Sequence, residues 1–355
     1  MQKPKSWPYI ALALLFLIIM VTVKPGEGIK LPDAETKKPV GGIQSDINAS
    51  VSTPAASETL PVLPDTPSQA PSEGLQIDWR RDDDSYAVLG LGSCTDSYIV
   101  IPDTYDGFPV TKIQMGAFAG ESITGIWIPD TVTVIEGDAF AGCLELSSVR
   151  IGDGVESIGG GAFSTCINLC EVTMGKGVRA IYNQAFLECK SLTTIRLPEG
   201  LQSIDYAAFY GTGLYEIEIP ASVTSLGEQL LNRSAQLTKI TVAAGNPVYH
   251  SSGNCIIETA SRKVIAGCRT SVIPNDGTVT EIGDYVFWGC EGLSNITIPR
   301  GVKRIGEYAF RGCFLLDMIH FEGTQSEWYA ITKGYNWSYE SHINTIRCTD
   351  GDLEM

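Results

Sequence analysis

The stretch IGGGAFSTCINLCEV, at positions 158–172, decides the fold because its pattern returns along most of the chain. Its anchor is Phe163, followed by a cysteine three residues later, a leucine at six and a β-branched residue at nine. The equivalent phenylalanines are Phe118, Phe140, Phe186, Phe209, Phe287 and Phe310. Neighbouring anchors within each run are 22 or 23 residues apart, and Leu231 takes the anchor position 22 residues after Phe209.

A fixed period of this length, with leucine and isoleucine at constant offsets, is typical of a leucine-rich repeat solenoid. Offsets nine and eleven are both apolar, as in Val172 and Met174, which predicts a strand in each repeat with one face inward. Stacked repeats place these strands side by side in a curved parallel sheet. The anchor rings are then expected to form a continuous spine on the opposite wall.

The N-terminal quarter of the chain has a different composition. Residues 1–24 combine Lys3 and Lys5 with an apolar run from Tyr9 to Val23, which fits a signal peptide or a single-span membrane anchor. Residues 25–75 hold eight prolines among serines, threonines and alanines, which predicts a disordered stalk. Both interpretations of the first segment predict export, either to the extracellular face of the membrane or as a secreted protein.

Residues 76–355 are predicted to form the repeat domain. We divide it into an N-terminal cap at 76–112, repeats at 113–242, an insert at 243–275, repeats at 276–321 and a C-terminal cap at 322–355. The insert contains CIIETASRKVIAGC at 255–268, two apolar runs around a polar turn that predict a β-hairpin. The last segment is rich in aromatic residues, including Trp328 and Trp337, which suits a cap and, as an alternative, a ligand site.

Seven of the ten cysteines fall into two groups, and Cys94, Cys170 and Cys348 remain unassigned. Five of them share offset three, and parallel side chains one strand spacing apart lie farther from each other than a disulfide prefers. We therefore interpret Cys143, Cys166, Cys189, Cys290 and Cys313 as packed thiols, with disulfides or a metal site as alternatives. Cys255 and Cys268 lie symmetrically about the hairpin turn, and we predict a disulfide between them.

Composition and spacing exclude several classes of function. A formal charge of −16 and a pI near 4.6 argue against a nucleic-acid partner. His250, His320 and His342 belong to different modules, and spacing alone assembles no nucleophile with a base and an orienting acid. We expect no catalysis, no cofactor, no metal and no small-molecule substrate.

The outward positions of the strands, at offsets eight and ten, form the candidate binding surface. Tryptophan and arginine are enriched among residues that dominate binding energy, so we single out Trp127, Arg150 and Arg196. A solvated face without a ligand is the alternative. The full candidate set is Trp127, Arg150, Glu171, Arg196, Glu216 and Glu218.

The repeated phrase IGxxAFxxCxxLxxI, the segment IPDTYDGFPVTKIQMGAF at 101–118, the insert NPVYHSSGNCIIETASRKVIAGC at 246–268 and FEGTQSEWYAI at 321–331 resemble the BspA-like leucine-rich repeat family of bacterial surface proteins. The resemblance covers about residues 85–351. It implies a surface-exposed solenoid without catalysis and, for some members, adhesion to host extracellular-matrix proteins or to other cells. A spacer without a specific ligand and a glycan-binding module are the alternatives.

Overall fold

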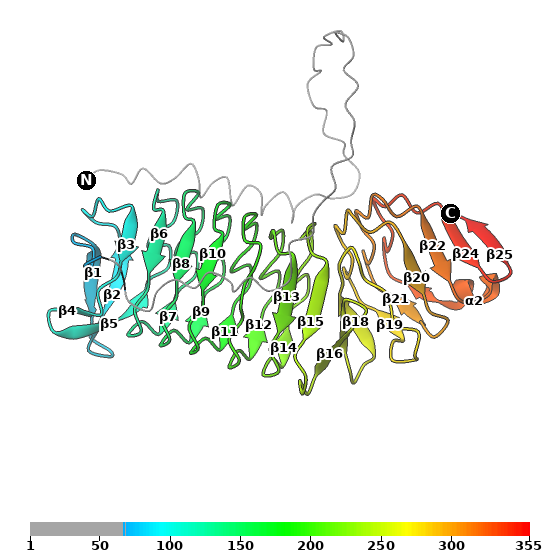
Figure 1. The fold of residues 1–355 in the computed structure, drawn as a ribbon, viewed down its shortest axis with the longest axis horizontal. Coiled ribbons are helices and arrows are strands. Elements are labelled where there is room, and N and C mark those ends of the chain that lie inside the picture. Colours follow the sequence, from blue (N-terminus) through cyan, green and yellow to red (C-terminus); the bar gives the residue numbers. More distant parts are fainter. Residues whose placement is uncertain (1–66, 68) are drawn as a thin grey trace, which may run out of the picture. The chain divides into compact units, whose positions relative to one another are not determined.

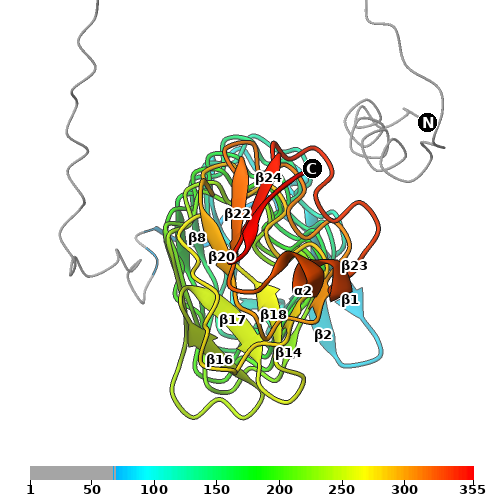
Figure 2. The same cartoon turned by 90° about the vertical axis from the view of Figure 1, so that its right-hand side faces the viewer.

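The computed structural model describes residue 67 and residues 69–355. These residues form a β-solenoid whose coils each contribute short parallel strands, so that the strands stand side by side along the long axis (Figure 1). Viewed along that axis, the coils superpose on one another (Figure 2). The predicted signal segment at 1–24 and nearly all of the predicted stalk lie outside the described residues.

One wall of the solenoid, the first wall, begins as a nine-stranded sheet. Its path is β1 (Gln76–Arg80), β2 (Ser85–Gly90), β5 (Phe108–Ile113), β7 (Val134–Ile135), β9 (Ser157–Ile158), β11 (Ala180–Ile181), β12 (Ser203–Ile204) and β14 (Ser225–Leu226), with β4 (Thr104–Tyr105) beside β5. From the insert onward it continues as a six-stranded sheet. The insert itself contributes β16 (Tyr249–Ser252), β17 (Cys255–Glu258) and β18 (Lys263–Ala266), and the later repeats and the C-terminal segment contribute β19 (Glu281–Ile282), β21 (Arg304–Ile305) and β23 (Thr332–Lys333).

The second wall carries the strands that the sequence predicted. Its three sheets are β3 (Tyr98–Val100), β6 (Gly125–Trp127), β8 (Ser148–Arg150) and β10 (Glu171–Thr173), then β13 (Glu216–Ile219) with β15 (Lys239–Val242), and finally β20 (Ile296–Ile298), β22 (Met318–Phe321), β24 (Thr345–Cys348) and β25 (Gly351–Glu354). All neighbours pair in parallel except β24 and β25. The inward residues at offsets nine and eleven are largely buried, as Val149 and Ile151 show.

The anchor rings form the predicted spine. Phe140 stacks on Phe118 and on Phe163 with ring centroids 5.1 Å apart in both pairs, and the stacking continues through Phe186 to Phe209. All five rings are fully buried. Stacked rings at one repeat spacing confirm the solenoid, because this arrangement requires every coil to turn in the same register.

The cysteines at offset three have a hydrogen-bonding role. In four repeats the thiol donates to the carbonyl of the anchor in the preceding repeat: Cys143 to Phe118 at 3.0 Å, Cys166 to Phe140 at 3.1 Å, Cys189 to Phe163 at 3.2 Å and Cys313 to Phe287 at 3.2 Å. These four thiols are buried and free, as the prediction of packed thiols requires. The fifth, Cys290, is free but less buried, and it donates to the carbonyl of Gly267 in the insert at 4.0 Å.

The insert is built into the first wall, where β18 pairs in parallel with β19, while on the side of the anchor rings the repeats on either side of it meet directly. The side-chain amide of Asn232, one residue after Leu231, donates to the carbonyls of Tyr285 and Trp288 at 2.5 and 3.2 Å. Within the insert, β17 and β18 form the predicted antiparallel hairpin, and β16 adds a third strand.

Both ends of the solenoid are covered. At the N-terminal end β1 pairs with β2 in antiparallel fashion. At the other end the short helix α2 (Gln325–Ala330) lies over the last coil (Figure 2), and its N-terminus is closed by a capping box between Thr324 and Glu327. Trp328 of this helix is buried and packs edge-on against Phe321 and Trp337. The aromatic C-terminal segment therefore acts as a cap through its tryptophans.

Candidate binding surface

Strand register on the second wall places its outward side chains in two rows. Tyr98, Gly125, Ser148 and Glu171 lie opposite one another in the first row. The second row consists of Val100, Trp127, Arg150 and Thr173. Three of the predicted site residues are thus gathered on the sheet formed by β3, β6, β8 and β10.

Trp127 and Arg150 form one closed unit. The guanidinium of Arg150 lies 4.3 Å from the centroid of the Trp127 ring. It donates to the carbonyl of Ile128 at 3.2 Å and pairs with the Asp130 carboxylate at 3.1 Å. Only 5% of Trp127 and 7% of Arg150 are exposed, although both were expected to project into solvent as hot spots. The expectation is corrected because the cation stacks on the ring and each covers the other.

Tyr98 completes this unit from the side. A Cβ on Gly125 would lie 2.4 Å from Cδ2 of Tyr98 and 2.8 Å from Oγ of Ser148, so only glycine leaves room for the ring. Burial raises the pKa of the Tyr98 phenol, the negative charge of Glu171 raises it further, and Arg150 opposes both. Tyr98, Arg150 and Glu171 therefore share one electrostatic environment on the outer face.

The other predicted residues lie farther along the second wall. Arg196 is exposed on a segment without regular strand, between β10 and β13. Glu216 and Glu218 are exposed on β13, and Lys239 of β15 pairs with Glu216 at 2.8 Å. This hydrogen bond to Glu216, together with the nearby negative charges, raises the pKa of Lys239. The structure thus separates the candidate set into a rigid part around Trp127 and an exposed charged part around Glu216.

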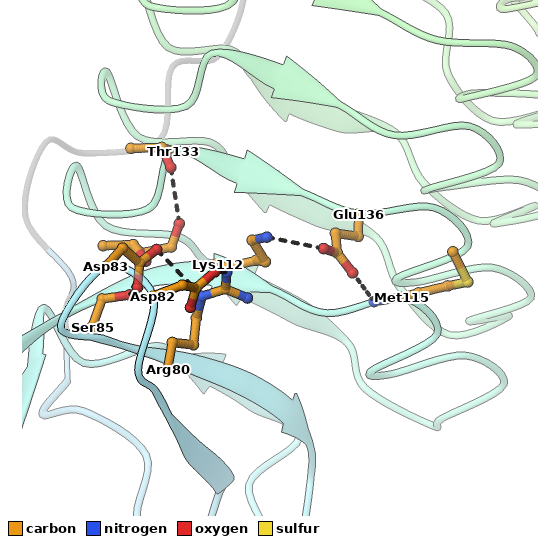
Figure 3. A network of polar contacts seen from close by, with 9 residues as sticks. Arg80, Asp82, Asp83, Ser85, Lys112, Met115, Thr133 and Glu136 are labelled. Carbon is orange, nitrogen blue, oxygen red and sulfur yellow. Dashed lines mark hydrogen bonds and ion pairs between the residues drawn. The ribbon is translucent and has the colours of Figure 1, made fainter.

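A polar network that the sequence did not predict joins the N-terminal cap to the first coils (Figure 3). Its centre is the Ser85 hydroxyl, 2.5 Å from Asp83 and 2.7 Å from the Thr111 hydroxyl, while Lys112 pairs with Glu136 at 3.2 Å. The hydrogen bond from Ser85 is the main reason that the pKa of Asp83 is lowered. Because the labelled groups contact one another, we interpret this network as structural.

The disulfide predicted between Cys255 and Cys268 is absent, since both thiols are free and buried. An irregularity between Ile256 and Ile257 shifts the hairpin register, so that Ile256 pairs with Ala266 and the two cysteines are not opposite each other. Burial raises the pKa of Cys255 to about 12, so its thiol stays protonated at neutral pH.

The part of the chain that the structure describes has no cluster of metal ligands and no membrane-spanning helix. No group of three or more histidine, cysteine, aspartate or glutamate residues there is placed to hold a metal ion. Among the helices of residues 67 and 69–355, none has the length and apolar character needed to cross a membrane.

A sequence profile for the BspA type leucine-rich repeat region matches residues 111–238 and 258–349, with six copies of the repeat. No curated protein matches the chain. The crystal structure of a leucine-rich repeat protein from Eubacterium ventriosum is 22% identical and covers 76% of this chain and 68% of its own, with a TM-score of 0.56.

Two further solved structures share the fold. A leucine-rich repeat protein from Bacteroides ovatus is 19% identical, with coverage of 78% of this chain and 70% of its own and a TM-score of 0.52. The pneumococcal vaccine antigen PcpA is 14% identical, with coverage of 79% and 87% and a TM-score of 0.52.

Proposed function

Because the chain belongs to the BspA type leucine-rich repeat family, we propose that it is a non-enzymatic cell-surface protein that mediates adhesion by binding protein partners on its second wall. The partners are host extracellular-matrix proteins or proteins on other cells. Residues 1–24 direct export or anchor the chain, and residues 25–75 hold the solenoid away from the membrane.

One observation supports this proposal: the second wall presents side chains in rows at fixed strand spacing, with a rigid part around Trp127 and an exposed charged part farther along the wall around Glu216. Extended surfaces of this kind are what repeat proteins use to bind large partners. Glu171, Arg196, Glu216 and Glu218 supply the charged contacts. Trp127 and Arg150 supply a preorganised base, which lowers the entropy cost of binding.

Glycan binding through the C-terminal tryptophans is not favoured. Trp328 is 2% exposed and offers no free ring face to a sugar, and the half-buried Trp337 packs on Phe310 and Trp328. A spacer without a specific ligand remains the outcome against which binding is tested.

The test displays the full chain on a non-adherent bacterium and measures attachment to immobilised matrix proteins and to cultured cells. We expect attachment above that of the same strain without the protein. Replacing Glu216 and Glu218 with lysine should reduce it, while lysine at Glu121 and Glu145, two exposed carboxylates outside the second-wall strands, should leave it unchanged. Attachment no higher than background would make the protein a spacer, and equal losses in both variants would indicate non-specific charge effects.

A further inference from the structure

Aromatic side chains collect beside the anchor spine in the C-terminal half of the solenoid. The ring of Trp288 contacts those of Tyr210 and Tyr285 at 5.8 and 5.7 Å between centroids. Tyr285 stacks on Tyr308 at 5.5 Å, and Tyr308 meets Tyr335 edge-on at 5.8 Å. We call this continuous set, Tyr210, Tyr285, Trp288, Tyr308 and Tyr335, the aromatic tract.

Two of these tyrosines occupy a position that disfavours them. The residue two places before the anchor has a positive φ, 60° at Tyr285 and 51° at Tyr308. Earlier repeats fill it with smaller or more tolerant residues, namely Gly116, Asp138, Gly161, Gln184 and Ala207, and their anchors stack equally well. A bulky residue in the left-handed region is unusual. The fold does not need a tyrosine here, and backbone strain of this kind gathers at functional sites.

Two carboxylates without an ion-pair partner among the described residues flank the stacked tyrosines. Glu228 and Glu307 are exposed, and the negative charges of both, after burial, raise the pKa of the Tyr285 phenol. Burial raises the pKa of the Tyr206 phenol, and the negative charge of Glu228 raises it further. Tyr206 is 40% exposed. Ring faces and uncompensated negative charge are therefore combined at one place.

The tract already holds one cation of its own. The guanidinium of Arg311 lies 5.1 Å from the Trp288 ring centroid, 5.5 Å from that of Tyr308 and 5.4 Å from that of Tyr339. Glu340 pairs with it at 3.0 Å. A guanidinium stacked on aromatic faces and paired with a carboxylate is the arrangement that arginine prefers. Around Tyr285, Glu228 and Glu307 no cation is stacked on a ring in this way among the described residues, although Arg304 pairs with Asp284, the residue before Tyr285, at 2.8 Å.

We propose that the aromatic tract, together with Glu228 and Glu307, docks an arginine- or lysine-rich segment of a partner polypeptide. One cationic side chain stacks on the Tyr285–Tyr308 pair and reaches both carboxylates. The net charge of −16 draws such a segment in from solution. This inference rests on the proposed protein-binding function, and it names a second contact region and the chemistry of the partner there.

The full chain is titrated with a ten-residue peptide of alternating arginine and glycine, and calorimetry measures the heat of binding at low and at high salt. We expect one saturable site that weakens as salt rises. Replacing Glu228 and Glu307 with glutamine should weaken binding about fivefold or more, because two charge contacts are lost. The matched control, Glu121→Gln with Glu145→Gln, removes the same charge from other exposed turns and should change affinity by less than about twofold.

A second variant tests the rings. Tyr285→Gln with Tyr308→Gln introduces the residue that the Phe186 repeat carries at the same position, Gln184, so the coil should fold as before. It should also lose peptide binding. The proposal is overturned where the charge variant binds like its control, or where an oligoglutamate peptide binds equally well. It is equally overturned where a neutral oligosaccharide binds and only the tyrosine variant abolishes that binding.

The two proposals fail separately. Loss of attachment in the Glu216 and Glu218 variant, with no peptide binding by the unmodified chain, would overturn the docking of a basic segment and leave adhesion in place. Peptide binding at the tract without attachment to any surface would overturn adhesion and leave the local chemistry in place.

Discussion

Substituting alanine for Phe163 tests the spine on which the architecture depends. Phe163 is fully buried, with Phe140 stacked on one face at 5.1 Å and Phe186 on the other at 5.3 Å. Removing a buried phenylalanine costs about 3–5 kcal/mol of folding free energy. Because two stacked contacts are lost here, we expect a value near the upper end, about 5 kcal/mol.

Hydrogen exchange measured by mass spectrometry tests this prediction, because it reports stability segment by segment. Each coil contacts only its neighbours, so the protein need not unfold in a single two-state transition. Protection should fall most in the coils of Phe140, Phe163 and Phe186 and least in those of Phe287 and Phe310. Ile167→Ala, in the same repeat but 38% exposed, is the control and should change little. A loss of unfolding free energy below about 1 kcal/mol, or a loss of protection spread evenly along the chain, would refute the idea that the stacked phenylalanines stabilise their own coils.

Three further predictions concern thiols and caps. Cys166→Ser should destabilise the protein less than Cys166→Ala, by about 1 kcal/mol in urea unfolding, because serine keeps a donor for the Phe140 carbonyl; equal losses would contradict this. Burial raises the pKa of Cys255 and of Cys313 from 9.0 to about 12, so the unfolded chain releases these protons first. Stability should therefore be retained below pH 9 and fall between pH 9 and about 12, and a urea midpoint that stays constant over that interval would exclude the effect. Thr324→Ala should cost about 1 kcal/mol and increase exchange in α2, and unchanged exchange there would show that the capping box contributes nothing.

The sequence predicted the second wall and, of the first wall, the hairpin of β17 and β18, but it missed the short repeat strands of the first wall for a reason visible in their length. Offsets nine and eleven alternate with outward residues, so β8 and its equivalents show period two. The first-wall strands β7 and β9 contain two residues each, too few for any alternation to appear. Their signal is instead the recurrent isoleucine before glycine, as in Ile158, which is fully buried. The helix α2 was missed in the same way, although Thr324 and Glu327 have the spacing of a capping box.

The candidate site was harder to predict than the fold, yet part of it was accessible. In a solenoid, residues one period apart lie side by side, so Trp127 and Arg150, 23 residues apart, are expected neighbours. The same rule finds the pair of Lys239 with Glu216. It cannot find Glu228 near Tyr285, because the insert separates them in sequence. That proximity exists only once the coils around the insert have stacked.

The recurring cysteine illustrates how a periodic residue can mislead about chemistry. In an exported protein a recurring cysteine suggests disulfides. The structure shows that this position instead holds a small side chain that donates a hydrogen bond to the anchor carbonyl of the previous coil. Ser234 does this in the Leu231 repeat, donating to Phe209 at 3.1 Å, the same distance as from Cys166 to Phe140. Since a hydroxyl serves as well as a thiol, sulfur is retained there for its size and its weak donor rather than for its redox chemistry.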